Sequence, residues 1–431
     1  MPTTTSPSAS AISPSCFSIT PLLLCVLPYT ALPSQPSLST LPLNPPPMAL
    51  HFTPSTPVIS DLTLHLKHTN QAGPEQTEIR STFFPAEWHP QSGVQLTWPH
   101  AATDWGPILA EVDDCFVKIA FEVLAHDELL LVVTPEPDRI QALLAERIPS
   151  RLLPQVRYFE CPTNDTWARD HAFLTLITEA GPRLLDFQFN GWGNKFPSEL
   201  DNAINSKIVN YKSSNCILKG TYESHLDFVF EGGAIESDGR GTLMTTSACL
   251  LSPNRNPSLT RDEIEQRLLR YFHAERVLWL DHGYLAGDDT GSHIDTLARF
   301  CPNNTIAYVQ CTDPTDEHYD ALRAMEQQLK EIISNFSLFS FNLLPLPMPD
   351  AIFDPDDGHR LPATYANFLV INGAVLMPTY GQPENDELAR RQLQKAFPKF
   401  DIVPIDCRIL IRQHGSLHCS TMQFPVGVMT G

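Results

Sequence analysis

The sequence predicts an α/β fold for the larger part of the chain. Short apolar runs that suit buried strands alternate with segments in which apolar residues recur at helical spacing, a pattern typical of α/β proteins. Hydrophobic residues make up 42% of the 431 positions, enough for a sizeable core. Residues 1–60 differ sharply, because they contain no Lys, Arg, Asp or Glu. We therefore expect one folded domain over residues 79–431, preceded by a low-complexity tail over residues 1–78.

The N-terminal tail is rich in Pro, Ser and Thr and lacks the periodicity of a helix or strand, so we expect most of it to be disordered. Residues 19–27 form an apolar run that contains Pro21 and is too short to span a membrane. The run could belong to a signal peptide, but no basic residues precede it. We favour a disordered tail, or an over-extended start with the initiator at Met48. We expect a cytoplasmic protein with no membrane partner, a targeting segment being the alternative.

Individual elements can be assigned from about Ser81 onward. Apolar spacing predicts helices at 108–123, 138–147, 316–336 and 385–397. Thr260 and Glu263 have the spacing of a capping box, which predicts a helix from there to about residue 273. Apolar runs predict strands at 129–133, 156–161, 276–280, 368–371, 375–377 and 402–405. We find no clear internal repeat in the sequence.

Charge and cysteine content narrow the classes of function. The formal net charge of −20 argues against a nucleic-acid partner, since phosphate binding needs a basic face. An acidic field favours a cationic ligand, although it also serves solubility alone. The 10 cysteines include no C-x-x-C pair, which argues against a zinc ribbon or a thioredoxin-like motif. Most of them, such as Cys115 and Cys249, lie in apolar runs and are expected to be small buried hydrophobes.

Cys419 is the candidate nucleophile. It follows Gly415 and Ser416 and precedes Ser420, and a thiolate can be reached and stabilised in such a polar loop. A buried structural cysteine is the alternative. We expect the neighbouring His418 not to be the base, because adjacent side chains on an extended segment point to opposite faces.

His293 and Asp295 form an H-x-D pair. On an extended segment they would share one face, so that an imidazole and a carboxylate address one ligand. A metal site is the alternative, but it needs more ligands than this pair offers.

Trp167 lies among charged residues in the segment Asn164–Asp170. Trp is costly to expose and offers the best aromatic face for a cation. Asp165 and Asp170 could each accept two hydrogen bonds from a planar guanidinium group.

Glu231 ends an apolar run and precedes two glycines that permit close approach to a ligand. It could orient a histidine or bind a cation, and a plain turn is about as good an interpretation.

Together these stretches resemble the agmatine deiminase and Porphyromonas-type peptidyl-arginine deiminase family, from about Phe84 to Gln423. The matching motifs are the following: Phe84-Pro85-Ala86-Glu87-Trp88, Trp98-Pro99-His100, Asp104-Trp105, Asn164-Asp165-Thr166-Trp167-Ala168-Arg169-Asp170, Phe189-Asn190-Gly191-Trp192-Gly193, Glu231-Gly232-Gly233, Asn254-Arg255-Asn256-Pro257, Gly287-Asp288-Asp289-Thr290, His293-x-Asp295, Asn372-Gly373 and His418-Cys419. The resemblance implies the pentein α/β propeller, in which five ββαβ-like units surround a pseudo-fivefold axis.

The resemblance also implies roles for the site residues. Cys419 is expected to be the nucleophile, His293 the general acid/base, and Asp170 and Asp295 the guanidinium ligands. Glu231 matches the remaining active-site acid. Trp167 matches a pocket residue, and Asp165 is expected to contact the substrate. No metal or organic cofactor is implied, and a homo-oligomer remains open.

The activity implied is hydrolysis of agmatine to N-carbamoylputrescine and ammonia through a covalent cysteine intermediate, a step of putrescine biosynthesis. Ser292 stands where agmatine deiminases usually have Gly, and Thr296 where they usually have Asn. These departures leave other substrates open. The alternatives are a peptidyl-arginine deiminase, another guanidino-compound hydrolase, an amidinotransferase, and an inactive pentein that only binds a guanidinium ligand.

Overall fold

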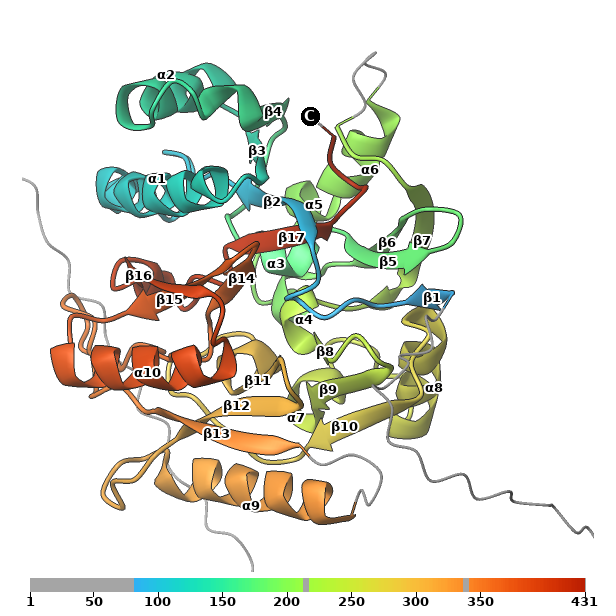
Figure 1. The fold of residues 1–431 in the computed structure, drawn as a ribbon, viewed down its shortest axis with the longest axis vertical. Coiled ribbons are helices and arrows are strands. Elements are labelled where there is room, and N and C mark those ends of the chain that lie inside the picture. The colour runs from blue at the N-terminus through green and yellow to red at the C-terminus, as the bar shows by residue number, and fades with distance from the viewer. Residues whose placement is uncertain (1–80, 212–216, 336–340, 431) are drawn as a thin grey trace, which may run out of the picture. The chain divides into compact units, whose positions relative to one another are not determined.

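The computed structural model describes residues 81–211, 217–335 and 341–430. The predictions for the tail at 1–78, for its boundary and for a start at Met48 lie outside the described residues. From Thr82 onward, strands and helices alternate along the chain (Figure 1), which confirms the predicted α/β class. Among the described residues, no helix is both long enough and apolar enough to cross a bilayer.

Within the described ranges of the chain, the strands form five separate sheets. The first contains β17 (Thr421–Pro425), β2 (Gln91–Thr97), β3 (Leu129–Thr134) and β4 (Val156–Glu160). The second contains β1 (Thr82–Phe83), β5 (Leu174–Thr178), β6 (Arg183–Gln188) and β7 (Thr221–Val229). The third contains β8 (Glu236–Ser237), β9 (Thr242–Thr246) and β10 (Arg276–Leu280). The fourth contains β11 (Ala298–Cys301), β12 (Thr305–Gln310) and β13 (Asn342–Pro347), and the fifth β14 (Leu369–Ile371), β15 (Ala374–Thr379) and β16 (Asp401–Asp406).

All five sheets share one connectivity that the sequence did not reveal. Each has an antiparallel pair whose second strand lies parallel to a third: β17–β2–β3, β5–β6–β7, β8–β9–β10, β11–β12–β13 and β14–β15–β16. The parallel step needs a crossover, and each crossover contains a helix. The repeat therefore lies in how the strands pair and not in matching residues.

The crossover helices are α1 (Leu109–Ala125), the group α4 (Gly191–Asn194), α5 (Glu199–Asn202) and α6 (Ile204–Asn210), the pair α7 (Ser247–Leu250) and α8 (Arg261–Tyr271), α9 (Tyr319–Asn335) and α10 (Pro383–Ala396). Figure 1 shows α9 alongside β12 and β13, and α10 beside the fifth sheet. In the first sheet, α2 (Pro137–Arg147) lies in a further parallel crossover, from β3 to β4. The helix α3 (Ala168–His171) lies outside the crossovers, and short 3-10 turns occur at Gly106–Ile108, Leu153–Gln155, Gly232–Ala234, Ile294–Thr296 and Leu410–Gln413.

The structure confirms the capping box. The Thr260 side chain accepts a hydrogen bond from the Glu263 backbone, and the Glu263 carboxylate accepts one from the Thr260 backbone. The predicted helix at 316–336 begins later, at Tyr319. The residues predicted as its first helical turn instead form a separate turn, in which the Asp316 carboxylate accepts a hydrogen bond from the backbone N–H of His318.

Candidate active site

Polar residues from all five connections between successive sheets gather at one place. Each connection supplies at least one of them: Asp170 in α3 between β4 and β5, Glu231 between β7 and β8, His293 and Asp295 between β10 and β11, Asn367 between β13 and β14, and Cys419 between β16 and β17. These six residues are all buried. A site built this way forms only when all five sheets are in place.

Cys419 lies in a turn just before β17, and its thiol faces two polar side chains. The Sγ atom lies 3.2 Å from Nδ2 of Asn367 and 3.8 Å from Oδ2 of Asp295. Burial raises the pKa of the Cys419 thiol well above its usual range, and the charges of Asp295 and Asp170 add to this. Burial and the two neighbouring acids therefore favour the protonated thiol over the thiolate.

Asp170 is held by two donors. Its Oδ1 accepts a hydrogen bond from the Gly233 backbone at 2.9 Å, and its Oδ2 accepts one from Nε1 of Trp192 at 2.9 Å. A Cβ at Gly233 would lie 2.5 Å from Nδ1 of His293 and 3.2 Å from Oδ2 of Asp295. Gly233 is therefore required, because it lets the histidine and both carboxylates approach one backbone segment.

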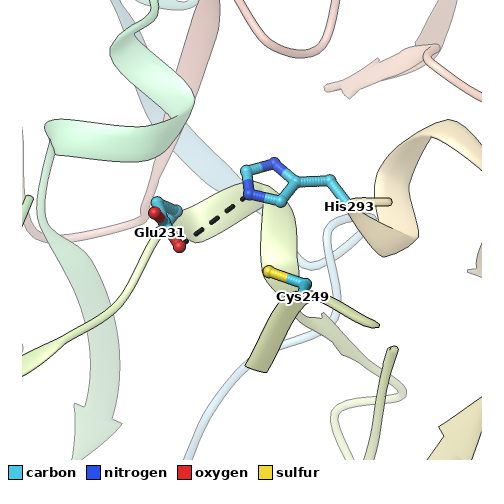
Figure 2. Close-up of side chains that lie close together, drawn as sticks. All are labelled: Glu231, Cys249 and His293. Atoms are coloured by element: carbon cyan, nitrogen blue, oxygen red, sulfur yellow. Dashed lines mark ion pairs between the residues drawn. The ribbon is translucent and has the colours of Figure 1, made fainter. Parts of the chain in front are cut away.

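His293 lies between two carboxylates. Its Nδ1 is 3.7 Å from Oδ1 of Asp170, and its Nε2 is 3.9 Å from Oε2 of Glu231 (Figure 2). Neither ring nitrogen has a hydrogen-bond partner among the described residues. Burial lowers the pKa of His293, but Asp170, Cys249 and Glu231 outweigh it and raise the pKa well above its usual range. A protonated imidazole beside two acids can donate a proton to a leaving group.

Glu231 is locked by Arg255. The Nε atom of Arg255 lies 3.0 Å and 2.8 Å from the two carboxylate oxygens of Glu231. Burial raises the pKa of Glu231, but the Arg255 charge and His293 outweigh it, so the net pKa is lowered. The Glu231 carboxylate is thus an anion that faces His293 from the side away from Asp170.

In the part of the chain that the structure describes, two groups of side chains have ligand atoms close enough for a metal ion, within 4.8 Å of one another: Glu231, Cys249 and His293 (Figure 2), and Glu87, Glu236 and His418. Arginines already neutralise the carboxylates of both groups. Arg255 binds Glu231, and Arg299 binds both Glu87 and Glu236. A metal ion would have to displace a buried guanidinium group, so these residues suit an ion-pair network better than a metal.

Two local predictions about backbone geometry are wrong. His293 and Asp295 do not share an extended segment, because Ile294–Thr296 forms a 3-10 turn. His418 and Cys419 do not point to opposite faces either. They lie in a turn, and Nδ1 of His418 and Sγ of Cys419 lie 2.8 Å and 3.8 Å from the same Oδ2 atom of Asp295.

A pocket opens in front of Cys419. It is lined by Asp104, Asp165, Trp167, Asp170, Trp192, Phe196, Asp289, Thr290, Gln413, His414, Gly415 and Cys419. Among the described residues, the lining includes four aspartates and no Lys or Arg. Aromatic walls with acidic groups between them suit a flat organic cation.

Asp165 and Trp167 hold one wall of this pocket. The two Asp165 carboxylate oxygens accept hydrogen bonds from Nε1 of Trp105 at 2.9 Å and of Trp167 at 3.0 Å. Burial raises the pKa of Asp165 to about 6. A Cβ at Gly415 would lie 2.3 Å from the Trp167 ring, so the loop that carries Cys419 packs directly on this indole. Asp165 thus fixes the indoles and lines the pocket at the same time.

The sequence analysis missed Asn367, Trp192 and Cys249 as neighbours of the site. Asn367 directly precedes a predicted strand, and a polar residue at such a position was a usable signal. Trp192 was noticed only as part of a motif. Nothing in the sequence connects Cys249 to His293, because the two meet only through the third sheet.

A family model described as Porphyromonas-type peptidyl-arginine deiminase matches residues 83–425. A solved structure named "Putative Arginine Deiminase from Porphyromonas gingivalis" is 49% identical, has a TM-score of 0.75, and covers 81% of this chain and 100% of that chain. A solved structure of a cysteine-to-serine variant of C. jejuni agmatine deiminase with substrate bound is 38% identical and has a TM-score of 0.72. The match covers 80% of this chain and 97% of that chain. A Vibrio parahaemolyticus protein named "Putative agmatine deiminase" is 35% identical over 358 residues, 80% of this chain and 96% of its own length.

Proposed function

Because the chain belongs to the Porphyromonas-type peptidyl-arginine deiminase family, we propose that it is an agmatine deiminase, a hydrolase that cuts a carbon–nitrogen bond of an amidine group. It converts agmatine and water to N-carbamoylputrescine and ammonia, a step that feeds putrescine synthesis. One observation carries the proposal: the thiol of Cys419 opens on a pocket whose lining includes four aspartates and no basic Lys or Arg.

The charge of the pocket favours agmatine over free arginine. Agmatine carries a guanidinium and an ammonium group and no carboxylate, whereas arginine needs a cation for its carboxylate. Arg255 is bound to Glu231, and Arg412 pairs with Asp354 and Asp356. Neither lines the pocket in front of Cys419.

Substrate binding prepares the nucleophile. Asp170 and Asp295 pair with the guanidinium, and its positive charge offsets the two acids that raise the pKa of the Cys419 thiol. The thiol then loses its proton to solvent, and the thiolate forms beside the guanidinium carbon. Trp167 covers the planar cation.

The reaction then proceeds in two halves. The thiolate of Cys419 bonds to the guanidinium carbon, and His293 gives its proton to one amino group, which leaves as ammonia. The product of this half is a cationic thiouronium on sulfur. Neutral His293 next takes a proton from water as the oxygen bonds to the same carbon. The carbon–sulfur bond breaks, the thiolate returns, and the ureido product loses its extra proton to solvent.

The five sheets suggest a finer description of the fold. Their shared connectivity, and the contribution of each inter-sheet connection to the site, support a pentein propeller with five units around a pseudo-fivefold axis. In that arrangement the site lies on the axis. Cytoplasmic localisation, a small guanidino compound as the partner, and a homo-oligomer stay predictions.

A substrate panel tests the function. The purified chain is incubated with agmatine, free arginine or an arginine peptide, and ureido product and ammonia are measured together. We expect turnover mainly of agmatine. Preferred turnover of the peptide would make the protein a peptidyl-arginine deiminase. Amidine transfer to an added amine would make it an amidinotransferase, and thermal stabilisation by agmatine without turnover would make it a binding protein.

A further inference from the structure

His418, which the proposed reaction does not use, connects the active site to a buried cluster of charges. Its Nδ1 lies 2.8 Å from Oδ2 of Asp295, and its Nε2 lies 2.7 Å from Oε2 of Glu87. The exposed fraction of the His418 side chain is 1%. The imidazole thus bridges a site carboxylate and a carboxylate from the segment before β2.

The two carboxylates that contact His418 are hydrogen-bond acceptors. Burial raises the pKa of Glu87 and of Asp295, but Arg299 and His418 lower the pKa of Glu87, and His418 that of Asp295, to a net value below the usual range. An ionised carboxylate can only accept a hydrogen bond, so Nδ1 of His418 donates to Asp295. On the other side of the ring, Nε2 lies 2.7 Å from Oε2 of Glu87 and 3.0 Å from Nη2 of Arg299.

Arg299 anchors this bridge. It donates to Glu87 at 2.7 Å and to Glu236 at 2.5 Å. It also donates to the backbone carbonyls of Ala366 and Phe368 at 3.0 Å and 2.6 Å. These two residues flank Asn367, whose side chain contacts the Cys419 thiol.

Asn367 joins the same network from its other side. Its Oδ1 accepts the backbone N–H of His418 at 2.9 Å, and its Nδ2 lies 3.2 Å from Sγ of Cys419. The cluster of Glu87, Arg299 and His418 therefore fixes both groups that contact the thiol, Asp295 and Asn367.

The bridge leaves one carboxylate oxygen free for substrate. Oδ2 of Asp295 is bound by His418, whereas Oδ1 is buried and has no hydrogen-bond partner among the described residues. A buried carboxylate oxygen is costly unless something donates to it. A guanidinium N–H would satisfy this atom.

We propose that His418 is a positioning residue that holds Oδ2 of Asp295, so that Oδ1 is aimed at the guanidinium, with Glu87 and Arg299 holding His418 in turn. The inference rests on the proposed deiminase function and assigns no proton transfer to His418. It explains why a histidine adjoins the nucleophile without acting as its base.

Two substitutions separate the two halves of the bridge. In His418→Asn, the amide nitrogen takes the place of Nδ1 and can still donate to Asp295. In His418→Gln, it takes the place of Nε2 and can donate only to Glu87. Both variants lose the imidazole ring, so they suffer similar losses of packing. They differ in whether Asp295 keeps its donor.

We expect kcat/KM for agmatine to fall roughly 10- to 150-fold more in H418Q than in H418N, the range for one hydrogen bond to a charged group. Thermal unfolding midpoints should fall by similar amounts in the two variants. Gln423→Ala is the matched control. Gln423 lines the same cavity as His418, and its Oε1 has no partner among the described residues, so this variant should keep wild-type kcat/KM. Equal kcat/KM in the two His418 variants, or more activity in H418Q, would overturn the proposal.

A second measurement needs no functional variant. Proton–nitrogen spectra of histidine-labelled wild-type protein should contain a slowly exchanging ring Nδ1–H that disappears in H418N or H418Q, whichever folds. A His418 ring without an N–H on Nδ1 would refute the bridge whatever the activity. Wild-type protein that does not turn over agmatine would instead reject the proposed function, since the ring spectrum does not depend on turnover.

Discussion

Trp192 offers a sharp test of how Asp170 is tuned. The indole N–H donates to Oδ2 of Asp170 at 2.9 Å, and the residue has a φ of 56°. A positive φ at a bulky residue carries strain, which the surrounding structure must offset. Trp192→Phe keeps an aromatic ring at this backbone position and removes only the N–H donor and the smaller second ring.

The hydrogen bond from Trp192 to Asp170 sets the size of the expected loss in kcat/KM. A hydrogen bond to a charged group contributes about 1.5–3 kcal/mol, so kcat/KM should fall roughly 10- to 150-fold. The pKa of Asp170 should also change. Burial raises it, while His293 and the Trp192 hydrogen bond lower it. Removing that bond raises the pKa further. Asp170 must be ionised to pair with guanidinium, so the acidic limb of the pH–rate profile should move to higher pH.

The assay is ureido-product formation from agmatine across a pH series, with thermal unfolding in parallel. Trp98→Phe is the matched control, because Nε1 of Trp98 also donates to a carboxylate, Oδ1 of Asp113, at 2.7 Å. Trp98 and Asp113 are buried but do not line the pocket in front of Cys419. W98F should lose stability and keep the wild-type pH profile. An unshifted acidic limb in W192F would refute the assigned role of this hydrogen bond.

Three further outcomes are expected. Cys419→Ala should abolish ureido-product formation while agmatine still raises the melting temperature, and residual turnover would remove Cys419 as the nucleophile. Arg255→Met leaves the Glu231 carboxylate buried without its partner and should cost about 3–5 kcal/mol of unfolding free energy in denaturant titrations, a loss that adding Glu231→Gln should partly reverse. Alkylation of Cys419 should be slow at neutral pH and accelerate with rising pH, because burial and nearby acids raise the thiol pKa. Asp295→Asn removes one of these acids and lowers that pKa, so it should speed alkylation at neutral pH, and an unchanged rate would contradict this electrostatic account.

The sequence predicts long helices well because helical periodicity needs several residues to appear, but the nine-residue strand β7 was not predicted. The strand predicted at 276–280 coincides with β10 (Arg276–Leu280). The two-residue β8 and the four-residue α3 escaped notice. Elements this short are determined by the strands and loops they pack against, and local sequence carries little of that information.

The site residues could be named from motifs, but their arrangement could not. The Ile294–Thr296 turn invalidated the argument from alternation around the H-x-D pair. Asn367 and Trp192 gain their roles from Cys419 and Asp170, which lie in other connections between sheets. Contacts between residues so far apart in the chain follow from sheet assembly and not from local spacing.

The pairing of β17 with β2 has a consequence for biosynthesis. A growing polypeptide makes β2 early and must leave that edge without a partner while the other four sheets are translated. The cysteine arrives just before the strand that completes the first sheet. A partly synthesised chain can therefore collapse before its site is complete. The thiol of Cys419 is added after Asp170, Glu231, His293, Asp295 and Asn367.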